Sequence, residues 1–464
     1  MGNVSLSLSK LSIFITVLFF LVTQSVFAQR PPVAPINLNY LRVEFIHPGA
    51  RPAALGGAFI GAAQDESAAP INPAGLTYLK SAGATLNQHH IRTDFDEPEG
   101  SPTQPNLRTN FQTINFNQTM VGIFVPLKRV TFAAFRALAF DSRYNFETRQ
   151  FLTTNSALDT RQVLGGLGNF PGKRVNLDLE MINDAVSISV QLHRRLSVGF
   201  TLKTSVLNFR LDEQTYLDPG VETGKPPGPN SARTTYSITT LDERNVQPGI
   251  TLGLLTQLLR DRLFLGAVLD FNPKFDLESQ IFLPEYKLSE QNLAAESPLN
   301  RTFDFRIPDV FGVGLYYIAQ PRLRFTLDLR HIQYSDLLDG NNLNAFEDDI
   351  FNEKTRQYED PDGRADLTVE DATEIHVGVE YLFKASRLGL VPLRFGVYTN
   401  PGHRIHAANN TPDLQRLFPK ARDRTHVTFG AGLVFNSYLK FDGALNISRD
   451  DLEIIGSTLI SIPF

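Results

Sequence analysis

Strict alternation of apolar and polar residues recurs along this chain, and this pattern constrains its fold more than any other feature. In segment 321–330, every second residue from Leu323 to Leu329 is apolar, and the residues between them are polar or charged. A strand with this sequence has one apolar face and one charged face. The same alternation is found in segments 186–192, 196–202, 375–381 and 427–435. Because nearly every such segment alternates and no helical pattern of comparable strength could cover a sheet, a membrane barrel is favoured over a soluble sandwich.

The number and spacing of these segments predict an all-β fold, a transmembrane antiparallel β-barrel of about 14 strands over residues 82–464. The expected strands span residues 82–92, 109–125, 130–148, 174–192, 196–211, 233–258, 262–280, 302–319, 322–335, 371–384, 391–400, 424–436, 438–448 and 452–464. Tight connections at 128–129, 193–195, 260–261, 320–321 and 436–437 alternate with long polar ones at 94–108, 149–173, 212–232, 281–301, 336–370 and 401–423. Only 384–391, which is longer than the other tight connections, and 449–451, which is shorter than the other long ones, depart in length. This alternation is typical of periplasmic turns and extracellular loops.

Residues 1–28 have the features of a cleavable signal peptide. Lys10 precedes an apolar run over residues 11–22, and the small-residue site Val26-Phe27-Ala28 follows. A transmembrane anchor is the alternative, but the run has about a dozen residues, whereas a spanning helix needs about 20. We therefore expect export, with a mature chain that begins at Gln29 and has no Cys there to carry a lipid.

The composition excludes several classes of function. The 464 residues include no Cys, which excludes a disulfide scaffold and a thiolate metal or redox site. The net charge of -5 gives no reason to expect a nucleic-acid partner. The sequence contains no Gly-x-Ser-x-Gly elbow, no His-Glu-x-x-His motif and no phosphate-binding loop. We therefore expect neither an enzyme nor a cofactor site.

Two patterns suggest a metal site only weakly, and we expect none. The side chains of His89 and His90 should point to opposite faces of a strand, where a solvated lumen His is the better interpretation. The acidic loop 347–371 contains Asp360-Pro361-Asp362-Gly363, but it lacks the remaining ligands of an EF-hand. A solvated outer loop is the expectation there, and divalent-ion bridging to lipopolysaccharide is the alternative.

Residues 29–81 lie between the expected cleavage site and the first strand, and they are too few for a domain. The stretch Gly49–Leu76 is rich in Gly and Ala, Gly56-Gly57 permits positive φ, and Pro73 fixes a turn after an extended Asn72. Small residues let one backbone approach another closely, which suits a plug packed inside a barrel. The alternative, a flexible linker, should contain more Ser, Pro and charge and fewer bulky apolar residues.

The chain resembles the FadL/TodX family of outer-membrane transporters for long-chain fatty acids and other hydrophobic compounds. The resemblance is carried by Gly49-Ala50-Arg51, Gly56 to Phe59, the acidic, Ala-rich step from Asp65 to Ala69, and Asn72 to Leu76. It continues with Pro308 ahead of Gly312–Tyr317, and with Leu393–Gly396 followed by Asn400-Pro401. The resemblance implies that residues 29–81 form a hatch that closes the lumen. The matching hatch residues are Gly49, Arg51, Gly56, Gly57, Phe59, Asn72, Pro73 and Ala74.

The resemblance further implies passive transport of a long-chain fatty acid or a similar hydrophobic small molecule. In this family the ligand binds from outside and leaves sideways into the membrane beside a kinked third strand, so outer-membrane lipid and lipopolysaccharide border its path. Lateral exit avoids exposing each CH₂ to water, which costs about 0.8 kcal/mol. The alternative is a partner in protein secretion, because PorV-like barrels share a similar Gly-Ala-rich start and Asn-Pro-Ala step. A closed apolar pocket would indicate transport, and a bound protein would indicate secretion.

The expected third strand is apolar on both faces, and its inward face carries Ala133, Phe135, Ala137 and Ala139. An apolar lumen face is unusual in a barrel otherwise lined by charge. We hypothesise that Phe135 and its Ala neighbours line the ligand path. The alternative is that this face packs against the apolar residues of the plug.

The C-terminal strand ends in Ile460, Ile462 and the terminal Phe464. Outer-membrane barrels commonly present such an alternating strand with a final aromatic residue to the barrel-assembly machinery, and this end resembles that signal. The sequence contains no Trp, so the interfacial girdles must rest on its 13 Tyr and 35 Phe residues. We expect the mature protein to reside in a bacterial outer membrane.

Overall fold

A computed structural model of the chain describes residues 41–98, 108–148, 151–152, 169–170, 172–217, 234–259, 261–282, 299–338, 350–352, 357–359, 367–385, 389–408, 415, 419–435 and 438–462. The expected signal peptide, the terminal Phe464 and the acidic motif at residues 360–363 lie outside this part of the chain. Within it, no helix has the length and apolar character needed to cross a membrane.

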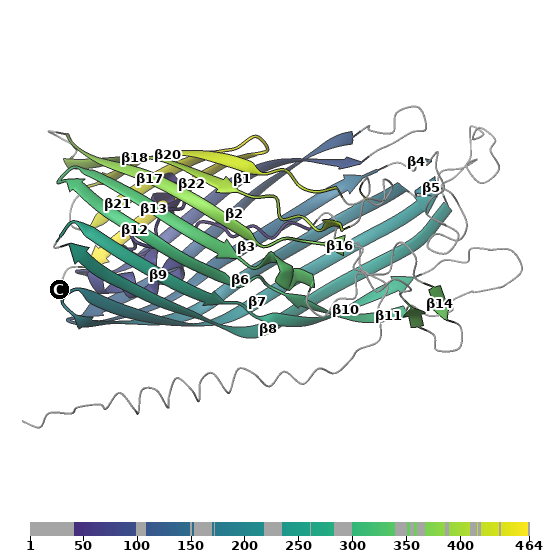
Figure 1. Cartoon of the computed structure of the whole chain (residues 1–464), viewed down its shortest axis with the longest axis horizontal. Coiled ribbons are helices and arrows are strands. Elements are labelled where there is room, and N and C mark those ends of the chain that lie inside the picture. The colour runs from purple at the N-terminus through teal and green to yellow at the C-terminus, as the bar shows by residue number, and fades with distance from the viewer. Residues whose placement is uncertain are drawn as a thin grey trace, which may run out of the picture.

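Sixteen strands form one antiparallel sheet (Figure 1). They are β1 (Ala82–Pro98), β2 (Arg108–Leu127), β3 (Val130–Glu147), β6 (Gly172–His193), β7 (Leu196–Leu217), β8 (Thr234–Leu259), β9 (Leu263–Phe271), β10 (Lys274–Phe282), β11 (Leu299–Arg306), β12 (Val310–Gln320), β13 (Leu323–Ile332), β17 (Ala372–Ala385), β18 (Gly389–Asn400), β20 (Arg424–Val434), β21 (Leu439–Ile447) and β22 (Asp451–Ile462). Three small sheets pair β4 (Phe151–Leu152) with β5 (Asn169–Phe170), β14 (Ile350–Asn352) with β15 (Gln357–Glu359), and β16 (Leu367–Thr368) with β19 (His406–Ala407).

The sheet closes into a barrel because β1 pairs with β22, from Ala82 opposite Ile462 to Thr93 opposite Asp451. Strands that are neighbours in sequence pair around the wall. Strands β9 and β10 together make one pass along the wall, as do β11 and β12, so the sixteen strands form a barrel of fourteen passes. The predicted all-β class and strand number are confirmed. Lys128 and Asp261 adopt positive φ values of 53° and 55° in two of the tight connections, which is the backbone conformation that short hairpin turns need.

The structure corrects two strand boundaries. Segments 262–280 and 302–319 were each expected as one strand, but they divide into β9 with β10 and β11 with β12. Both divisions contain a proline, Pro273 or Pro308, which has no N–H for the ladder. Polar groups join the two breaks, since the Asn272 side-chain amide donates to the Pro308 carbonyl at 2.8 Å and the Asn272 N–H donates to the Asp309 carboxylate at 2.7 Å.

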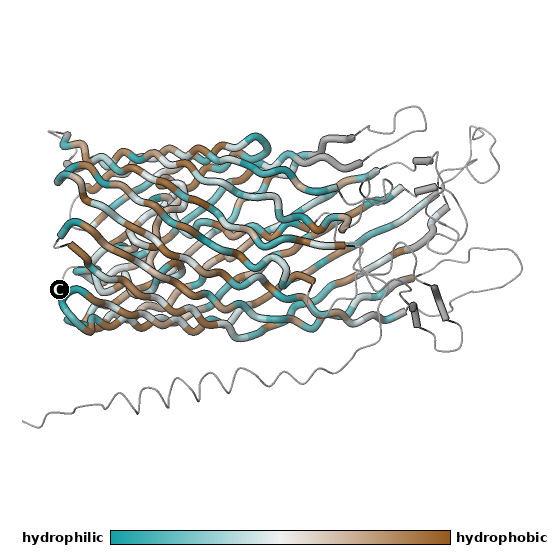
Figure 2. The backbone as a smooth tube through the Cα atoms, viewed as in Figure 1, coloured by the Kyte–Doolittle hydropathy of each residue, from teal (hydrophilic) through white to brown (hydrophobic). Residues whose placement is uncertain are grey.

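The outer face carries a belt of exposed apolar side chains towards the tight-turn end of the barrel. Figure 2 shows hydrophobic colour concentrated over that half and hydrophilic colour over the opposite ends of the long strands. The belt includes Ile123, Val186, Leu252, Leu327, Val377, Leu393, Phe429 and Ile454. Because lipid replaces water around this belt, the period of two predicts the lipid-facing surface directly.

Residues 41–81, called the inner segment below, are packed against the inward faces of the strands. The segment contains α2 (Ala50–Ala54), α3 (Ala68–Ile71) and the 3-10 helix η1 (Pro73–Tyr78). Helix α2 contacts β18, β20, β21 and β22, and η1 contacts β3, β6, β7 and β8. A second 3-10 helix, η2 (Tyr334–Leu338), follows β13. The inner segment therefore contacts strands from both the first and last thirds of the barrel.

Candidate functional site

Every residue expected in the hatch lies in the inner segment and is buried: Gly49, Arg51, Gly56, Gly57, Phe59, Asn72, Pro73 and Ala74. Gly56 and Gly57 have φ values of 63° and 76°. A Cβ on Gly56 would lie 2.8 Å from the Val397 nitrogen, so only glycine allows this turn to pass so close to β18. The sequence predicted that these residues belong to one closely packed segment, and their role as a hatch stays a prediction.

The Asn72-Pro73-Ala74 step is fitted against two strands. The fully buried Asn72 side chain donates to the Ile60 carbonyl at 2.9 Å and to the Leu254 carbonyl of β8 at 3.1 Å. It also accepts from the Ala74 N–H at 3.3 Å, which caps η1. This side chain thus joins two turns of the inner segment to each other and to the barrel wall.

Close backbone contact continues where the inner segment passes β12. The Asp328 carboxylate of β13 accepts hydrogen bonds from the Phe59 and Ile60 N–H groups at 2.5 and 2.6 Å. A Cβ on Gly314 would lie 2.6 Å from the Gly61 nitrogen and 2.1 Å from Asp328 Oδ1. Gly314 therefore allows the carboxylate to reach the inner segment.

A Gly314→Val substitution is expected to displace residues 59–61 and to lower the free energy of unfolding by about 1–3 kcal/mol, as overpacking does. The temperature at which the folded barrel loses its compact mobility in detergent gels measures this change. Gly443→Val is the matched control, because a Cβ there meets no atom within 4 Å. Equal melting of the two variants would contradict the assigned contact.

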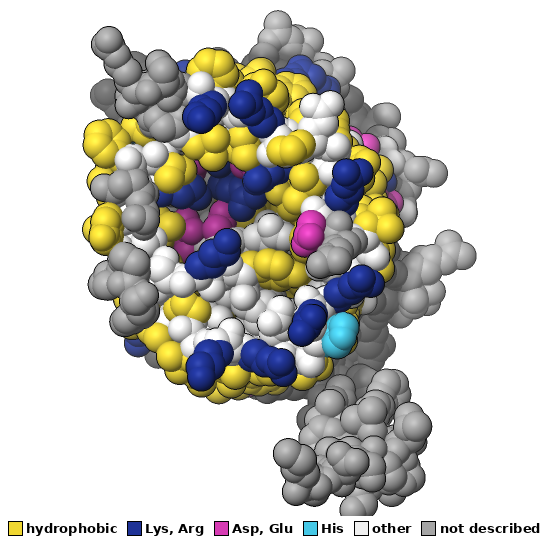
Figure 3. Space-filling model, turned by 90° about the vertical axis from the view of Figure 1, so that its left-hand side faces the viewer, with side chains coloured by type: hydrophobic (Ala, Val, Ile, Leu, Met, Phe, Trp, Pro, Cys, Tyr) yellow, Lys and Arg dark blue, Asp and Glu magenta, His cyan; other side chains and the backbone are white. Residues whose placement is uncertain are grey.

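Buried ion pairs attach the inner segment near the tight-turn ends of four strands. Arg51 contacts Asp65 at 2.8 Å and Glu380 at 3.2 Å. Glu380 also contacts Arg394 at 2.7 Å and Arg324 at 2.9 Å. The network continues from Arg394 to Asp442 at 2.6 Å and from Asp442 to Lys440 at 2.8 Å. Figure 3 looks onto the tight-turn end and shows a hollow in which basic and acidic side chains gather.

Burial and pairing set the charges of the inner segment itself. Burial opposes the charge of Arg51, but Glu380 and Asp65 raise its pKa well above the ordinary value. Burial also opposes ionisation of Asp65, yet Arg51 and Lys440 lower its pKa. Burial raises the pKa of Glu66 to about 7 although Lys440 lies nearby. Arg51 and Asp65 thus form a charged pair at neutral pH, where Glu66 is partly protonated.

On the opposite side of the inner segment, the lumen is lined by buried apolar side chains. Most come from β3, β6, β7, β10 and β11, and the others come from the inner segment, η2, strands β8, β12, β13, β16, β17 and β19, and residues adjoining the strands. The cluster includes Phe140, Tyr144, Val175, Leu177, Leu179, Met181, Leu207, Phe209, Leu211, Phe275, Leu277, Phe303 and Phe305. A lumen of this composition suits an apolar ligand, since each buried CH₂ is worth about 0.8 kcal/mol.

Sequence reasoning missed this apolar lumen, although a signal for it exists. In β6, the apolar residues from Val175 to Met181 occupy odd positions and face inward, whereas Val186 and Ile188 occupy even positions and face outward. Polar residues such as Asp178 take the outward positions in the first half, and Ser187 takes an inward position in the second. The apolar face therefore switches sides along one strand, which marks the point where the outer surface passes from water to lipid.

The expected ligand-path residues of β3 meet the inner segment. Ala133, Phe135 and Ala137 are buried in the same cluster as Ala62, Ala69 and Leu76 of the inner segment. Ala139 lies within a bulge between Leu138 and Phe140, and its carbonyl accepts from the Ile46 N–H at 2.9 Å. Packing of this inward face of the third strand against the plug was the alternative to a ligand path, and the ligand-path role of these residues stays a prediction.

A cavity of about 110 Å³ adjoins this bulge. Its wall combines the bulge residues 137–139, residues 45–48 of the inner segment, and Val268, Asp270 and Asn272 around the end of β9. Arg330 of β13 contributes a basic group to the wall. The cavity therefore lies between the inner segment and the apolar lumen.

Beside the same bulge, the ladder between β2 and β3 stops. Their pairs run from Leu127 opposite Val130 only as far as Met120 opposite Ala137, although both strands continue. The β1 register also shifts opposite Thr119 of β2, so both strands are irregular at one level. Above this level, an Asn117–Asp141 side-chain hydrogen bond spans the two strands. In the described chain, residues 108–119 of β2 and residues 138–147 of β3 have no backbone pairs with each other, and we call this stretch of the wall the β2–β3 split.

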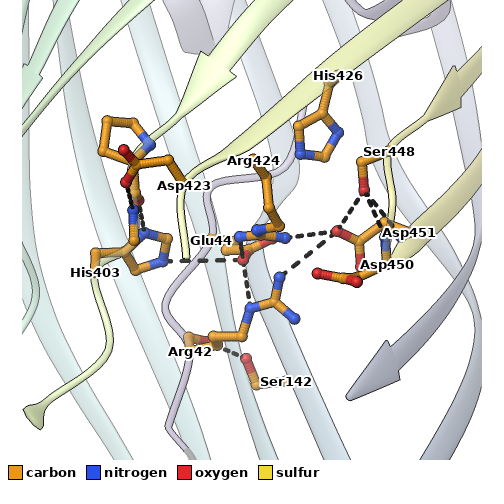
Figure 4. Close-up of polar contacts among 12 residues, drawn as sticks. Arg42, Glu44, Ser142, His403, Asp423, Arg424, His426, Ser448, Asp450 and Asp451 are labelled. Carbon is orange, nitrogen blue, oxygen red and sulfur yellow. Dashed lines mark hydrogen bonds and ion pairs between the residues drawn. The ribbon is translucent and has the colours of Figure 1, made fainter. Parts of the chain in front are cut away.

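The beginning of the inner segment is held by charged groups at the first residues of β20 and β22, which are the ends of these strands away from the tight turns (Figure 4). Arg42 contacts Glu44 at 2.6 Å, and Glu44 also pairs with Arg424 of β20. Arg424 contacts Asp451 of β22 at 2.6 Å. Figure 4 shows these groups converging beside Ser142 of β3, whose hydroxyl donates to the Arg42 carbonyl. Residues 41–47 are thereby fixed against three strands.

The remaining predicted positions are placed without forming a shared site. His89 is buried beside Glu453 at 3.7 Å rather than solvated, and His90 packs on the opposite face against Phe116. Ile460 is exposed on the outer face of β22, while Ile462 ends that strand. Among the described residues, no group of three His, Asp or Glu side chains is arranged to hold a metal ion.

Known proteins share this architecture. A family model described as outer membrane protein transport protein (OMPP1/FadL/TodX) matches residues 48–451. A Pseudomonas aeruginosa FadL homologue is similar over 90% of this chain and 99% of its own, with a TM-score of 0.59 and 16% identity. The Pseudomonas putida toluene transporter TodX is similar over 91% and 99%, with a TM-score of 0.51 and 14% identity. The CymD monoaromatic hydrocarbon channel is similar over 90% and 97%, with a TM-score of 0.52 and 14% identity. No curated protein sequence matches the chain.

Proposed function

The chain belongs to the OMPP1/FadL/TodX family of outer membrane transport proteins, and we propose that it passively transports hydrophobic small molecules such as long-chain fatty acids. The observation that supports this function most directly is the buried apolar lumen above the inner segment. Inward-facing Phe and Leu side chains would be costly in a channel for polar solutes, because they order water along its wall. They favour a ligand that leaves water on binding.

Release through the barrel wall is the second part of the proposal. The inner segment is packed against the strands below the lumen, and the cavity beneath the apolar cluster reaches the β3 bulge. The β2–β3 split begins at this bulge and supplies a place where the wall can widen without breaking a backbone ladder. A ligand that leaves there passes from an apolar lumen to the apolar membrane and avoids the charged tight-turn end.

We propose that the inner segment is the described part of a hatch comprising residues 29–81. The eight hatch residues hold it against the wall, while residues 1–28 direct export and residues 82–464 form the barrel. Ile460, Ile462 and Phe464 would present the C-terminal strand to the barrel-assembly machinery. The assembled barrel would lie among outer-membrane lipid and lipopolysaccharide.

Native mass spectrometry with lipid extraction tests the function on protein purified from outer membranes. We expect a co-purifying apolar molecule, and cells expressing the chain should take up radiolabelled oleate or toluene faster than cells with an empty vector. A barrel without apolar ligand but with a stoichiometric protein would instead support the secretion role of PorV-like barrels. Absence of uptake with both probes would contradict the proposed transport.

A Phe135→Asp substitution is expected to reduce uptake roughly tenfold, equal to about 1.4 kcal/mol. The reason is that a carboxylate beside Ala133 and Ala137 would bring water into an apolar wall. Phe135→Leu, which keeps an apolar side chain of similar size, is the matched control. A folded Phe135→Asp barrel that retains normal uptake would exclude Phe135 from the ligand path and leave packing on the inner segment as its role.

A further inference from the structure

The wall has a second break, between β8 and the two strands that follow it. Strand β8 pairs with β9 from Leu259 opposite Leu263 to Ile250 opposite Phe271. It pairs with β10 only at residues 238–240, opposite residues 280–282. Between these ladders, residues 241–249 of β8 have no backbone pair with residues 272–279 in the described chain. We call this gap, which is closed by ladder at both ends, the β8 window.

The break affects only one edge of β8. On its other edge, β8 pairs with β7 through the same level, including Leu241 opposite Leu211 and Gly249 opposite Lys203. The position of the window is therefore set by the β9–β10 division at Asn272-Pro273. Continuing the β8–β9 register would place Asn245 opposite Asp276, and there the Asn245 side-chain amide donates to the Asp276 carbonyl at 2.8 Å. A side chain thus bridges the space that a backbone pair would close.

The surroundings of the window differ between its inner and outer sides. On the inner side, Leu241, Phe275 and Leu277 are buried members of the apolar lumen. On the outer side, Val246, Ile250 and Phe271 remain exposed at 38–44%, at the upper limit of the apolar belt. The next outward residues include Arg244, Asp242 and Lys274, and Lys274 pairs with Asp304 at 2.7 Å. The window therefore lies where the lipid-facing belt meets the charged outer surface.

The window also adjoins the internal cavity. Asp270 and Asn272, at the lower edge of the window, line the same cavity as the bulge residues 137–139 at the β2–β3 split. Lys203 reaches this edge and contacts Asp270 at 2.6 Å and Asn272 at 2.9 Å. One cavity thus extends from one wall break to the other.

We propose that the β8 window is a second lateral opening, through which apolar or single-chain amphiphilic molecules exchange between the outer membrane interface and the internal cavity. The proposal rests on the proposed transport function. Its distinct content is that the lumen can be reached through the wall at a point other than the β2–β3 split. The exposed Val246, Ile250 and Phe271 suit a hydrocarbon chain or ring, and the charged Asp242, Arg244 and Lys274 around the same window suit a polar head group.

Single cysteines test the window, because the chain has no Cys of its own. Asn245→Cys places a thiol in the window, and Thr239→Cys on the same strand is the matched control. Thr239 is also half-buried and lies on the same face of β8, but it is paired on both edges, opposite Glu213 and Ile281. Each variant is labelled with a bulky maleimide in intact cells, and oleate uptake is compared with unlabelled cells of the same variant.

Labelling of Asn245→Cys should reduce the initial uptake rate at least fivefold, and labelling of Thr239→Cys should change it less than twofold. Complete labelling of Asn245→Cys with uptake unchanged would overturn the proposal. If Asn245→Cys does not assemble, Gln247→Cys takes its place, because the Gln247 amide donates to Asn245 at 3.4 Å. A parent chain that takes up neither oleate nor toluene would refute the transport function itself, so the two failures are distinguishable.

As a measurement independent of transport, a membrane-dissolved pyrene maleimide should react at least fivefold faster with Asn245→Cys than with Thr239→Cys. Equal reaction rates would contradict access from the membrane interface. Faster reaction together with unchanged uptake after labelling would show an opening that the transported ligand does not use, and would also overturn the proposed role.

Discussion

Bridging Asn117→Cys and Asp141→Cys with a short bis-methanethiosulfonate is expected to lower uptake of an apolar probe by roughly tenfold or more, as locking a gating element does. These two side chains already touch across the β2–β3 split, where the backbones of β2 and β3 are not paired with each other. A covalent bridge would prevent the strands from moving apart. Dithiothreitol removes the bridge and should restore uptake in the same cells.

The control for this lock places the same bridge lower on the same strands. Ile123 and Ala134 are already opposite each other in the intact part of the ladder, so bridging cysteines there should leave uptake unchanged. Uptake that persists in the bridged Asn117→Cys/Asp141→Cys protein would exclude the split as the exit. Loss of uptake in both bridged proteins would show a general effect of cross-linking these strands.

Replacing Glu380 with Ala is expected to destabilise the protein by about 3–5 kcal/mol, the range for removing one partner of a buried ion network. Glu380 is 3% exposed and contacts Arg51, Arg324 and Arg394. Its removal leaves three guanidinium groups with one carboxylate fewer, and Arg51 loses its attachment to β17. We therefore expect the inner segment to loosen together with the loss of stability.

Urea unfolding in lipid bilayers, followed by circular dichroism because the chain lacks Trp, measures this loss. Glu370→Ala removes another acid with a close cation, Lys420 at 2.5 Å, but that pair is more than half exposed. Its loss should change stability by less than about 1 kcal/mol. Similar effects of the two substitutions would contradict the structural role assigned to the buried network.

The two predictions examine different parts of one path. Glu380 lies near the tight-turn ends of the strands and attaches the inner segment to the wall, whereas Asn117 and Asp141 lie across the β2–β3 split. If the inner segment closes the lumen and the split releases the ligand, the lock should reduce uptake without affecting stability. Glu380→Ala should instead lower stability. It should also admit polar solutes, because the inner segment is loosened.

Local pattern predicted most of the barrel. Alternation from Leu323 to Leu329 already separates an outward face from an inward face, because successive side chains of a strand point in opposite directions. Tight and long connections supplied the strand order, and the small residues of Gly49–Leu76 indicated a segment able to pack closely against a wall. The structure confirms the fold class and the strand number with few changes of boundary.

The sequence also indicated the apolar lumen, but only through a switch of the apolar residues from one face of a strand to the other. Reading β6 for alternation alone identifies a strand, while the shift from Val175–Met181 to Val186–Val190 shows that its apolar face changes sides. A strand read in isolation does not tell which of these faces is inward. Neighbouring strands with the same switch, such as β7 from Leu211 to Leu202, make the assignment possible.

The sequence by itself determined the barrel, the lipid-facing belt and the compact inner segment, because each follows from residue type at a spacing of one strand or one turn. Only the tertiary structure decided where the backbone ladder of the wall is interrupted. The β2–β3 split and the β8 window depend on which residue of one strand lies opposite which residue of another. The bulge at Ala139 moves the buried positions of β3 from odd to even numbers, and the division at Asn272-Pro273 moves them from even numbers in β9 to odd numbers in β10. These shifts fix the pairing only together with the neighbouring strand, because the residue types of one strand do not tell which residue of another lies opposite.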